Sequence, residues 1–388
     1  MKTKRIFLMV MDSFGIGGAA DAERFGDKGA DTLRSLMQTQ DFFTPNLARL
    51  GLFHIDGVLE QKPYSMPFGA YGRLCEMSDG KDSTIGHWEI AGIYADEALP
   101  TYPNGFPDEI LKEIEERTGR AVLCNQAYSG TEVIKVYGEE HMKTGGLIVY
   151  TSVDSVMQIA AHTDVMPLEE LYRCCEIARE VLSGEHCVGR VIARPFNGEY
   201  PYKRIAGRHD YSAKPPKTTV LDLLKKNGFA TIAVGKINDI YAGEGISEAY
   251  GTSSNEEGME ISSQLLGKAF TGLCFVNFVD FDTVYGHRRN AKGYADAVMK
   301  LDAWLGGFIE NMKDDDILMI TGDHGCDPSY LGTDHTRENV PLLMYGKAVK
   351  PKNIGTRASF SDIAATVADI FEIPYGLNGE SFKNEVME

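Results

Sequence analysis

The chain has 388 residues, of which 43% are hydrophobic and 24% are charged, and its formal net charge is -17 at pH 7. This composition is typical of a folded globular protein, and the length predicts a main domain with a smaller second one. The acidic excess disfavours a sequence-independent hold on nucleic acid and docking on anionic membranes, because both depend on clustered lysine and arginine.

The first predicted element is a buried strand within RIFLMVMDSFG (residues 5–15), which runs into Asp12. The basic residues before this apolar run resemble the start of a signal peptide. The run is short and lacks a small-residue cleavage site, so a strand is favoured. No segment approaches the roughly 18 apolar residues of a membrane span. The seven cysteines form no CxxC pair, which predicts reduced thiols and a cytoplasmic protein.

A pair of hydroxyls stands where the next notable helix is expected to begin, in GKDSTIGHWE (residues 80–89). On one reading, Ser83 or Thr84 caps the helix by accepting a hydrogen bond from a backbone amide of its first turn. On the other reading, one hydroxyl takes part in chemistry, because the start of a helix favours phosphoryl oxygens. Spacing alone does not choose between the two neighbours.

The sequence changes character between residues 100 and 217. The stretch YPNGFPDEI (102–110) reads as a linker, and strand-like runs follow in residues 146–162 and 188–196. Residues 190–217 hold seven Lys or Arg against two acids. In so acidic a chain, this segment favours a receptor for a phosphorylated small molecule, with a solvated basic face as the alternative. We predict a core of residues 1–99 and 218–388, with residues 100–217 inserted as a cap.

Short apolar runs alternate with amphipathic helical stretches along the chain, which predicts an α/β fold with a mostly parallel sheet flanked by helices. Three runs finish in acids: RIFLMVMDSFG, LCFVNFVDFDTVYGH (273–287) and DDDILMITGDHGCD (314–327). An aspartate after a strand is often a turn or cap residue. Ligands nevertheless gather at the carboxyl ends of strands in such sheets, so these three runs could converge on one site.

Carboxylates and imidazoles without thiolate suit Mn²⁺, Mg²⁺ or Zn²⁺ in an open catalytic site. We expect Cys326 to be a bystander, because a soft thiolate fits poorly among hard carboxylates. Two cations and a hydroxyl are the parts of a phosphoryl or sulfuryl transfer site. The candidate ligands are Asp12, Asp280, Asp282, His287, Asp323, His324 and, in GTDHTREN, His335.

Five motifs in order, VMDSFGIG, DGKDSTIGHWE, NFVDFDTVYGHRR, TGDHGCDP and GTDHTRENVPLL, resemble those of the phosphopentomutase family in the alkaline phosphatase superfamily. The resemblance runs nearly end to end and implies an alkaline phosphatase-like core interrupted by a smaller α/β cap. It implies an enzyme that interconverts ribose 1-phosphate and ribose 5-phosphate, or the 2-deoxyribose equivalents, in the cytoplasm. It also implies two Mn²⁺ ions, with Mg²⁺ or another divalent ion as alternatives, and glucose 1,6-bisphosphate as activator.

Carried over residue by residue, the resemblance matches Thr84 to the threonine that bears the phosphoryl group, with a pentose 1,5-bisphosphate as intermediate. Ser83 remains the rival and would then cap the helix. Two groups of three residues match the metal ligands: Asp12, Asp323 and His324 for one ion, and Asp282, His287 and His335 for the other.

For the substrate, the resemblance supports an arginine-rich cap pocket, in which Arg194 and Arg208 are the candidates for holding the distal phosphate. The match leaves open whether Arg190 takes the place of Arg194. From the core side, Lys236 is expected to join them. Ser152 and Asp154 are candidates for hydrogen bonds to the sugar hydroxyls, with a helix N-cap as the alternative for Asp154. Closure of the cap is expected to exclude water and so protect the phosphorylated enzyme from hydrolysis.

Two other functions stay open. One is another phosphotransferase of the same superfamily, either a phosphoglycerate mutase or a phosphatase. The other is a metal-dependent module that binds sugar phosphates without turning them over, although an intact hydroxyl in GKDSTIGH argues against it. The expected partners are small pentose phosphates. The sequence does not decide whether chains associate, and a monomer is compatible with it.

Overall fold

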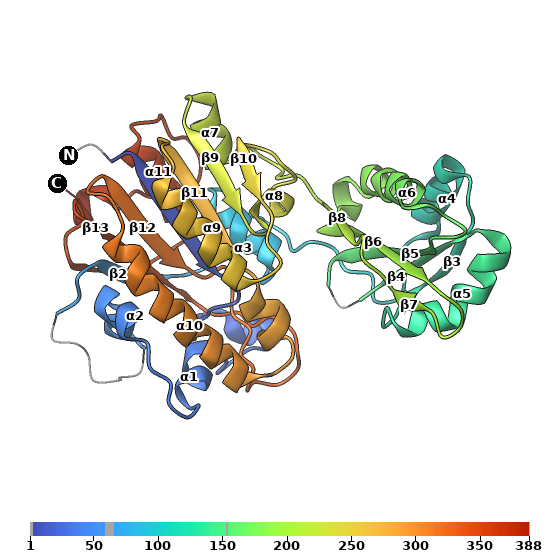
Figure 1. The fold of residues 1–388 in the computed structure, drawn as a ribbon, viewed down its shortest axis with the longest axis horizontal. Coiled ribbons are helices and arrows are strands. Elements are labelled where there is room, and N and C mark those ends of the chain that lie inside the picture. The colour runs from blue at the N-terminus through green and yellow to red at the C-terminus, as the bar shows by residue number, and fades with distance from the viewer. Residues whose placement is uncertain (1–2, 59–65, 153, 388) are drawn as a thin grey trace. The chain divides into compact units, whose positions relative to one another are not determined.

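The computed structural model describes residues 3–58, 66–152 and 154–387. The chain divides into two compact units, a core unit of residues 1–98 and 215–388 and a second unit of residues 99–214 (Figure 1). The division predicted from the sequence lies within three residues of this one at each boundary. The role of the second unit as a substrate-binding cap stays a prediction.

An eight-stranded sheet forms the centre of the core unit, in the order β10-β9-β11-β1-β12-β13-β2-β14. Neighbouring strands are parallel except at β13, which is antiparallel to β12 and β2. The prediction of a mostly parallel sheet is therefore confirmed. The strands are β1 (Arg5–Met11), β2 (Ala70–Leu74), β9 (Ala230–Val234), β10 (Glu248–Tyr250), β11 (Gly272–Phe278), β12 (Asp316–Thr321), β13 (Val340–Gly346) and β14 (Lys352–Arg357).

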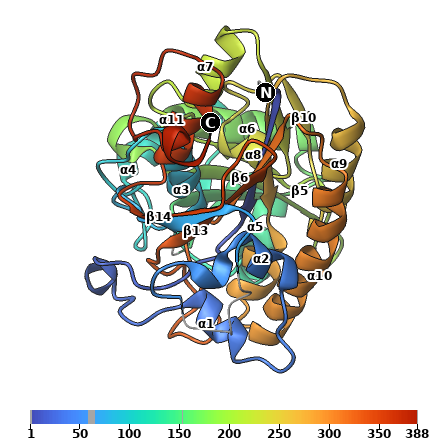
Figure 2. The ribbon, with the colours of Figure 1, turned by 90° about the vertical axis from the view of Figure 1, so that its left-hand side faces the viewer.

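Helices cover both faces of this sheet, with α9 and α10 on one side and α3 and α11 on the other (Figure 2). Because both faces are covered, every residue of the central strands β1, β11 and β12 is buried, which explains their mostly apolar sequences. The α-helices of the core unit are α1 (Thr32–Met37), α2 (Pro45–Leu50), α3 (Ser83–Ile90), α7 (Val220–Lys226), α8 (Ile237–Ile240), α9 (Asn255–Gly267), α10 (Ala291–Glu310), α11 (Asp362–Ile370) and α12 (Lys383–Val386).

The register of the three central strands brings their carboxyl ends together. Val10 of β1 pairs with Asn277 of β11 on one side and with Thr321 of β12 on the other. Asp12 follows directly after β1, and Asp323 follows two residues after β12. A short π-helical segment, Phe281–Gly286, comes after β11. It contains the predicted ligand Asp282 and ends one residue before the predicted ligand His287. All three segments therefore deliver polar side chains to one edge of the sheet.

The second unit has its own sheet, in the order β3-β4-β5-β6-β7, with β8 paired to β6. Side chains of α4 and α6 form one apolar cluster with the sheet, whereas α5 contributes to a separate cluster. The unit therefore has its own hydrophobic interior. Its elements are α4 (Asp108–Thr118), β3 (Val122–Ala127), α5 (Glu132–Thr144), β4 (Leu147–Thr151), β5 (Val156–His162), α6 (Leu168–Val181), β6 (Arg190–Asn197), β7 (Lys203–Arg204) and β8 (His209–Ser212).

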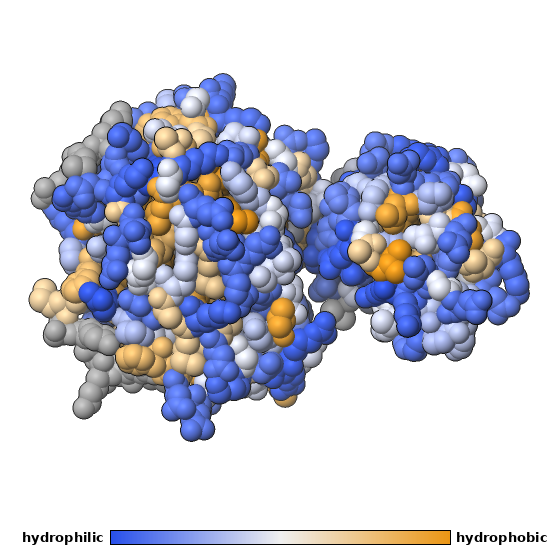
Figure 3. Space-filling model, in the orientation of Figure 1, coloured by the Kyte–Doolittle hydropathy of each residue, from blue (hydrophilic) through white to orange (hydrophobic). Residues whose placement is uncertain are grey.

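Hydrophilic residues cover most of the surface in the space-filling view, and apolar residues show as separate groups among them (Figure 3). Within the part of the chain that the structure describes, no helix combines the length and the apolar character needed to cross a membrane.

Candidate metal centre and acceptor hydroxyl

An outer ligand group, Asp282, His287 and His335, gathers where the π-helical segment meets the loop before β13. His287 Nε2 lies 3.3 Å from Asp282 Oδ2, and His335 Nε2 lies 3.4 Å from Asp282 Oδ1. The two imidazole Nε2 atoms are 3.1 Å apart. Ligand atoms that share an ion at about 2.1 Å lie about 3.0–3.4 Å from one another in octahedral or tetrahedral geometry. These side chains are therefore spaced to hold a cation.

An inner ligand group, Asp12, Asp323 and His324, lies at the ends of β1 and β12. His324 Nε2 is 3.6 Å from Asp12 Oδ1 and 3.4 Å from Asp323 Oδ2. The ligand atoms of these three side chains all lie within 4.8 Å of one another, and so do those of Asp282, His324 and His335. The two groups therefore adjoin, and the His324 and His335 rings have centroids 4.0 Å apart.

The donor chemistry of both groups fits divalent cations. The buried oxygens Asp282 Oδ1 and Asp323 Oδ2 accept no hydrogen bond from the described residues. His287 Nδ1 donates to the Thr333 carbonyl at 2.6 Å, and His324 Nδ1 donates to the Gly325 carbonyl at 3.0 Å. Each of these imidazoles therefore presents the lone pair of Nε2 to the cluster, as metal-binding histidines do. Orphaned carboxylate oxygens and oriented imidazoles are ligands that an ion would satisfy.

Electrostatics point the same way. Burial, reinforced by the charges of Asp323 and Asp282, raises the pKa of Asp12 to about 7. Burial alone would also raise the pKa of Asp282, but the neighbouring His335 and His287 together outweigh burial and hold that pKa well below its usual range. Burial lowers the pKa of His324 to about 4, so its imidazole is neutral near pH 7. The mutual repulsion of the carboxylates is the condition that a bound cation relieves.

The hydroxyl that faces this cluster belongs to Ser83. Its Oγ lies 3.0 Å from His324 Nε2 and donates to Asp12 Oδ1 at 3.4 Å. Ser83 and Thr84 are the first two residues of α3, and successive side chains on a helix point about 100° apart. The structure thus differs from the sequence prediction, which named Thr84 and left Ser83 as a cap.

Capping falls to the preceding residue. Asp82 Oδ1 accepts hydrogen bonds from the backbone N–H of Thr84 at 2.9 Å and of Ile85 at 3.2 Å. These two first-turn amides are therefore already satisfied, and the expectation that free amides there would receive phosphoryl oxygens is wrong for them. Because Asp82 is the cap, Ser83 is released from that role and its hydroxyl can point to the ligands.

Comparisons with known proteins agree with this geometry. Residues 4–375 match the family described as the Metalloenzyme superfamily. A phosphopentomutase from Lachnoclostridium phytofermentans is 55% identical over 99% of this chain and 100% of its own length. Another, from Alkaliphilus oremlandii, is 51% identical over 99% of both chains. This chain belongs to the phosphopentomutase family.

The fold of this phosphopentomutase family member also matches a solved structure. The PH0037 protein from Pyrococcus horikoshii aligns over 98% of this chain and 100% of its own, with a TM-score of 0.50 and 15% sequence identity. At that identity, the likeness concerns the fold alone.

Two buried residues behind the ligands were missed by the sequence reasoning. His87 Nδ1 donates to the Ser83 carbonyl at 2.8 Å and lies 3.1 Å from Asp323 Oδ2. Asn277 Nδ2 donates to Asp12 Oδ2 at 2.9 Å and lies 3.2 Å from His87 Nε2. A sequence signal existed for both, since His87 follows Ser83 by one helical turn and Asn277 is a polar residue inside an apolar strand.

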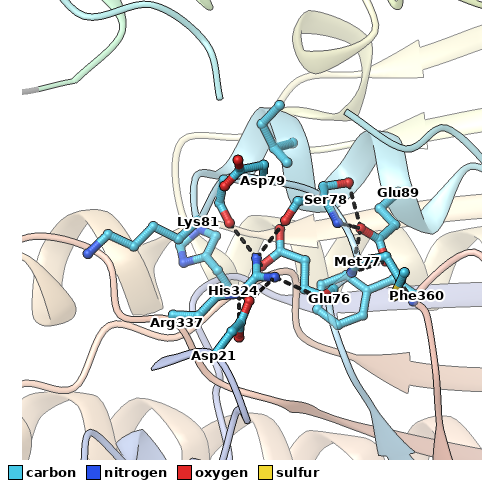
Figure 4. A network of polar contacts seen from close by, with 12 residues as sticks. Asp21, Glu76, Met77, Ser78, Asp79, Lys81, Glu89, His324, Arg337 and Phe360 are labelled. Atoms are coloured by element: carbon cyan, nitrogen blue, oxygen red, sulfur yellow. Dashed lines mark hydrogen bonds and ion pairs between the residues drawn. The ribbon is translucent and has the colours of Figure 1, made fainter. Parts of the chain in front are cut away.

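A third missed residue, Arg337, ties the loop before α3 to the loop that carries His335 (Figure 4). Its guanidinium donates to the carbonyls of Glu76 at 2.7 Å, Ser78 at 2.9 Å and Gly80 at 2.5 Å. It also forms ion pairs with Glu76 Oε2 at 2.6 Å and Asp21 Oδ2 at 2.9 Å. Arg337 is 3% exposed and its partner Glu76 is buried as well, whereas Asp21 is partly exposed.

The same loop is held from the other side by Glu89 of α3. Its carboxylate accepts hydrogen bonds from Met77 N–H at 2.9 Å, Ser78 N–H at 2.7 Å and Ser359 Oγ at 2.8 Å. The segment that leads into Ser83 is therefore fixed by one buried cation and one buried anion. Both contacts bear on the position of the candidate acceptor hydroxyl.

Two predicted substrate residues of the second unit, Arg194 and Arg208, are near enough for their charges to interact. Arg194 Nε donates to Gln158 Oε1 at 3.0 Å, and burial together with the charge of Arg208 lowers the pKa of Arg194 to about 10. Two hydrogen bonds, of 2.7 and 2.6 Å, join Arg208 to the Asp210 carboxylate. These arginines form a positive group whose mutual repulsion a phosphate would relieve.

The other predicted substrate residues are placed separately. Ser152 and Asp154 lie between β4 and β5, where Ser152 Oγ accepts a hydrogen bond from the Asp154 backbone N–H at 3.3 Å. Asp154 does not begin a helix, so the N-cap alternative is wrong. Lys236 lies at the start of α8 in the core unit, and its charge opposes the rise that burial causes in the pKa of Asp12.

Asp280, a predicted candidate ligand, lies outside both ligand groups, whereas Cys326, expected to be a bystander, lies beside the outer group. Asp280 accepts a hydrogen bond from the Asn255 backbone N–H at 2.6 Å, so it holds the start of α9 instead of joining a ligand group. The Cys326 thiol, in contrast, lies with ligand atoms of Asp282 and His287 inside a 4.8 Å group.

Proposed function

We propose that this chain is a metal-dependent phosphopentomutase that interconverts ribose 1-phosphate and ribose 5-phosphate, or their 2-deoxyribose equivalents. The observation that carries the proposal is the Ser83 hydroxyl, 3.0 Å from His324 Nε2 and next to Asp12 inside two adjoining groups of metal ligands. Membership of a family whose curated relatives bear that name supports the choice of substrate.

The two ligand groups define the roles of the residues. Divalent ions, for which Mn²⁺ is the first choice and Mg²⁺ an alternative, would lower the pKa of the acceptor hydroxyl and stabilise charge on the transferring phosphoryl group. Asp12, Asp323 and His324 hold the inner ion beside Ser83. Asp282, His287 and His335 hold the outer one. His87 fixes the start of α3 through the Ser83 carbonyl.

Ser83 carries the phosphoryl group between two transfers. In the first, the anomeric hydroxyl of a pentose 5-phosphate attacks phosphorus, the bond from phosphorus to Ser83 Oγ breaks, and a pentose 1,5-bisphosphate forms. In the second, Ser83 Oγ attacks the 5-phosphate of that bisphosphate and releases the pentose 1-phosphate. A hexose bisphosphate such as glucose 1,6-bisphosphate supplies the first phosphoryl group.

The second unit contributes recognition of the distal phosphate. Arg194 and Arg208 provide guanidinium groups, which match the geometry of a phosphate better than an ammonium does. Lys236 is a further candidate for holding the distal phosphate, and Ser152 and Asp154 are candidates for hydrogen bonds to the sugar hydroxyls. The seven cysteines are all free thiols, which supports a reducing compartment and hence action in the cytoplasm.

A coupled assay tests the function directly. Purified protein is given ribose 1-phosphate, with and without Mn²⁺ and a bisphosphate primer, and the formation of ribose 5-phosphate is followed. We expect turnover that requires both additions, with 3-phosphoglycerate left unchanged. Release of inorganic phosphate in place of ribose 5-phosphate would identify a phosphatase and refute the proposal, and turnover of 3-phosphoglycerate would identify a phosphoglycerate mutase.

A further inference from the structure

A thiol is built into the wall of the outer ligand group. Cys326 is 1% exposed, and its Sγ donates to the Asp334 carbonyl at 3.6 Å, one residue before His335. On its other side it packs against Gly286, one residue before His287, where a Cβ would approach Sγ to 2.9 Å. The thiol is thus wedged between the backbone segments that carry the two outer histidines.

The distances allow this thiol to become a ligand. The ligand atoms of Asp282, His287 and Cys326 all lie within 4.8 Å of one another. Atoms that share a tetrahedral zinc ion, with Zn–S of about 2.3 Å and Zn–N of about 2.1 Å, lie about 3.6 Å apart. A shift of roughly 1 Å therefore brings these three atoms to ligand spacing, and the buried Asp282 Oδ1, which accepts no hydrogen bond from the described residues, is available to an ion.

His335 adds a fourth donor to this group of Asp282, His287 and Cys326, because its Nε2 lies 3.4 Å from Asp282 Oδ1 and 3.1 Å from His287 Nε2. Such a set suits a borderline-soft ion such as Zn²⁺ or Cd²⁺ in a closed tetrahedral site. A harder ion such as Mn²⁺ prefers carboxylate, imidazole and water, and keeps coordination positions open. The same residues therefore offer two coordination modes, and the identity of the ion decides between them.

We infer that Zn²⁺ and Cd²⁺ bind the outer group with Cys326 as fourth ligand, forming a closed site that does not support turnover. On binding, the S–H bond of Cys326 breaks, its proton passes to solvent, and a metal–sulfur bond forms. The protein would then be inhibited by these ions through its own thiol. This inference rests on the proposed metal-binding role of Asp282, His287 and His335.

Zinc X-ray absorption on the metal-free full-length protein, loaded with two equivalents of Zn²⁺, tests the inference. For the unaltered protein we expect a nitrogen and oxygen shell plus one sulfur at about 2.3 Å for every two zinc ions. In Cys326→Ser the sulfur shell disappears, and zinc affinity of the outer site falls by at least about tenfold. Cys187→Ser, which alters a half-buried thiol of the second unit, is the matched control and keeps the sulfur shell.

The outcomes separate this inference from the proposed function. Two zinc ions bound by nitrogen and oxygen alone in the unaltered protein would overturn the role of Cys326 and leave the metal centre intact. A sulfur shell that persists in Cys326→Ser would overturn it equally. Failure to bind zinc at all would overturn both. Because the spectrum of the unaltered protein decides by itself, the test holds even if the variant folds poorly.

Discussion

Replacing Arg337 tests whether its buried contacts hold the segment that leads into Ser83. In Arg337→Met, the Glu76 carboxylate loses a cation at 2.6 Å, and both side chains are at most 2% exposed. Removing one partner of a buried ion pair costs about 3–5 kcal/mol. Three backbone carbonyls also lose a donor, at about 1 kcal/mol each or more.

Two effects reduce that sum. Burial raises the pKa of Glu76 well above its usual value, so the carboxyl can take up a proton when its partner is gone. Water can also reach some of the freed carbonyls. We therefore expect the free energy of unfolding to fall by about 3–5 kcal/mol in total. Arg337→Lys should lose less of the free energy of unfolding than Arg337→Met, because an ammonium keeps the positive charge. It should still lose some, because an ammonium does not reproduce the planar set of donors of a guanidinium.

Urea unfolding measures this loss, with Lys347→Met as matched control. Lys347 pairs with Asp314 on the surface, where both side chains are more than 60% exposed, and its removal should cost about 0–1 kcal/mol. In a double-mutant cycle, Glu76→Leu combined with Arg337→Met should recover part of the loss. The reasoning is refuted if Arg337→Met destabilises no more than the control, or if the two substitutions are additive.

Three further predictions concern the metal centre itself. A proton on Asp12, whose pKa is raised to about 7, competes with the inner ion, so manganese affinity should fall as the pH drops below 7. Calorimetry should find about one proton released per inner ion at pH 6 and almost none at pH 8. Equal proton release at the two pH values would contradict this prediction. Asp323→Ala or His335→Ala should abolish turnover, whereas Asp280→Ala should lose stability but keep metal binding; a ligand variant at full rate in added Mn²⁺ would disprove the assignment. Gly86→Ala should misplace α3 and cut turnover, because its Cβ would meet the Asp323 carbonyl oxygen at 2.1 Å, and a normal rate would show that α3 is not held there.

The ligand groups could be predicted because they follow strands. Asp12, Asp282 and Asp323 come after mostly apolar runs, and parallel pairing in register leaves the ends of such runs at one edge of a sheet. The mostly parallel sheet followed from the same runs. The ligand positions and the parallel sheet could therefore both be predicted from the apolar runs and the acids that follow them.

The choice between Ser83 and Thr84 could not be predicted, because it depends on the rotation of α3 about its axis. That rotation is set by contacts distant in sequence, such as Gly86 against Asp323 and Glu89 against Ser359. Arg337 was missed for a similar reason. An arginine beside a predicted ligand reads as a surface charge until burial shows that three carbonyls and two acids surround it.

The identity of the phosphorylated hydroxyl tests the central claim most directly. The protein is incubated with Mn²⁺ and glucose 1,6-bisphosphate, digested, and sequenced by tandem mass spectrometry. The account predicts phosphate on Ser83, its loss together with turnover in Ser83→Ala, and its retention in Thr84→Val. Phosphate on Thr84, with Ser83→Ala fully active, would contradict the account.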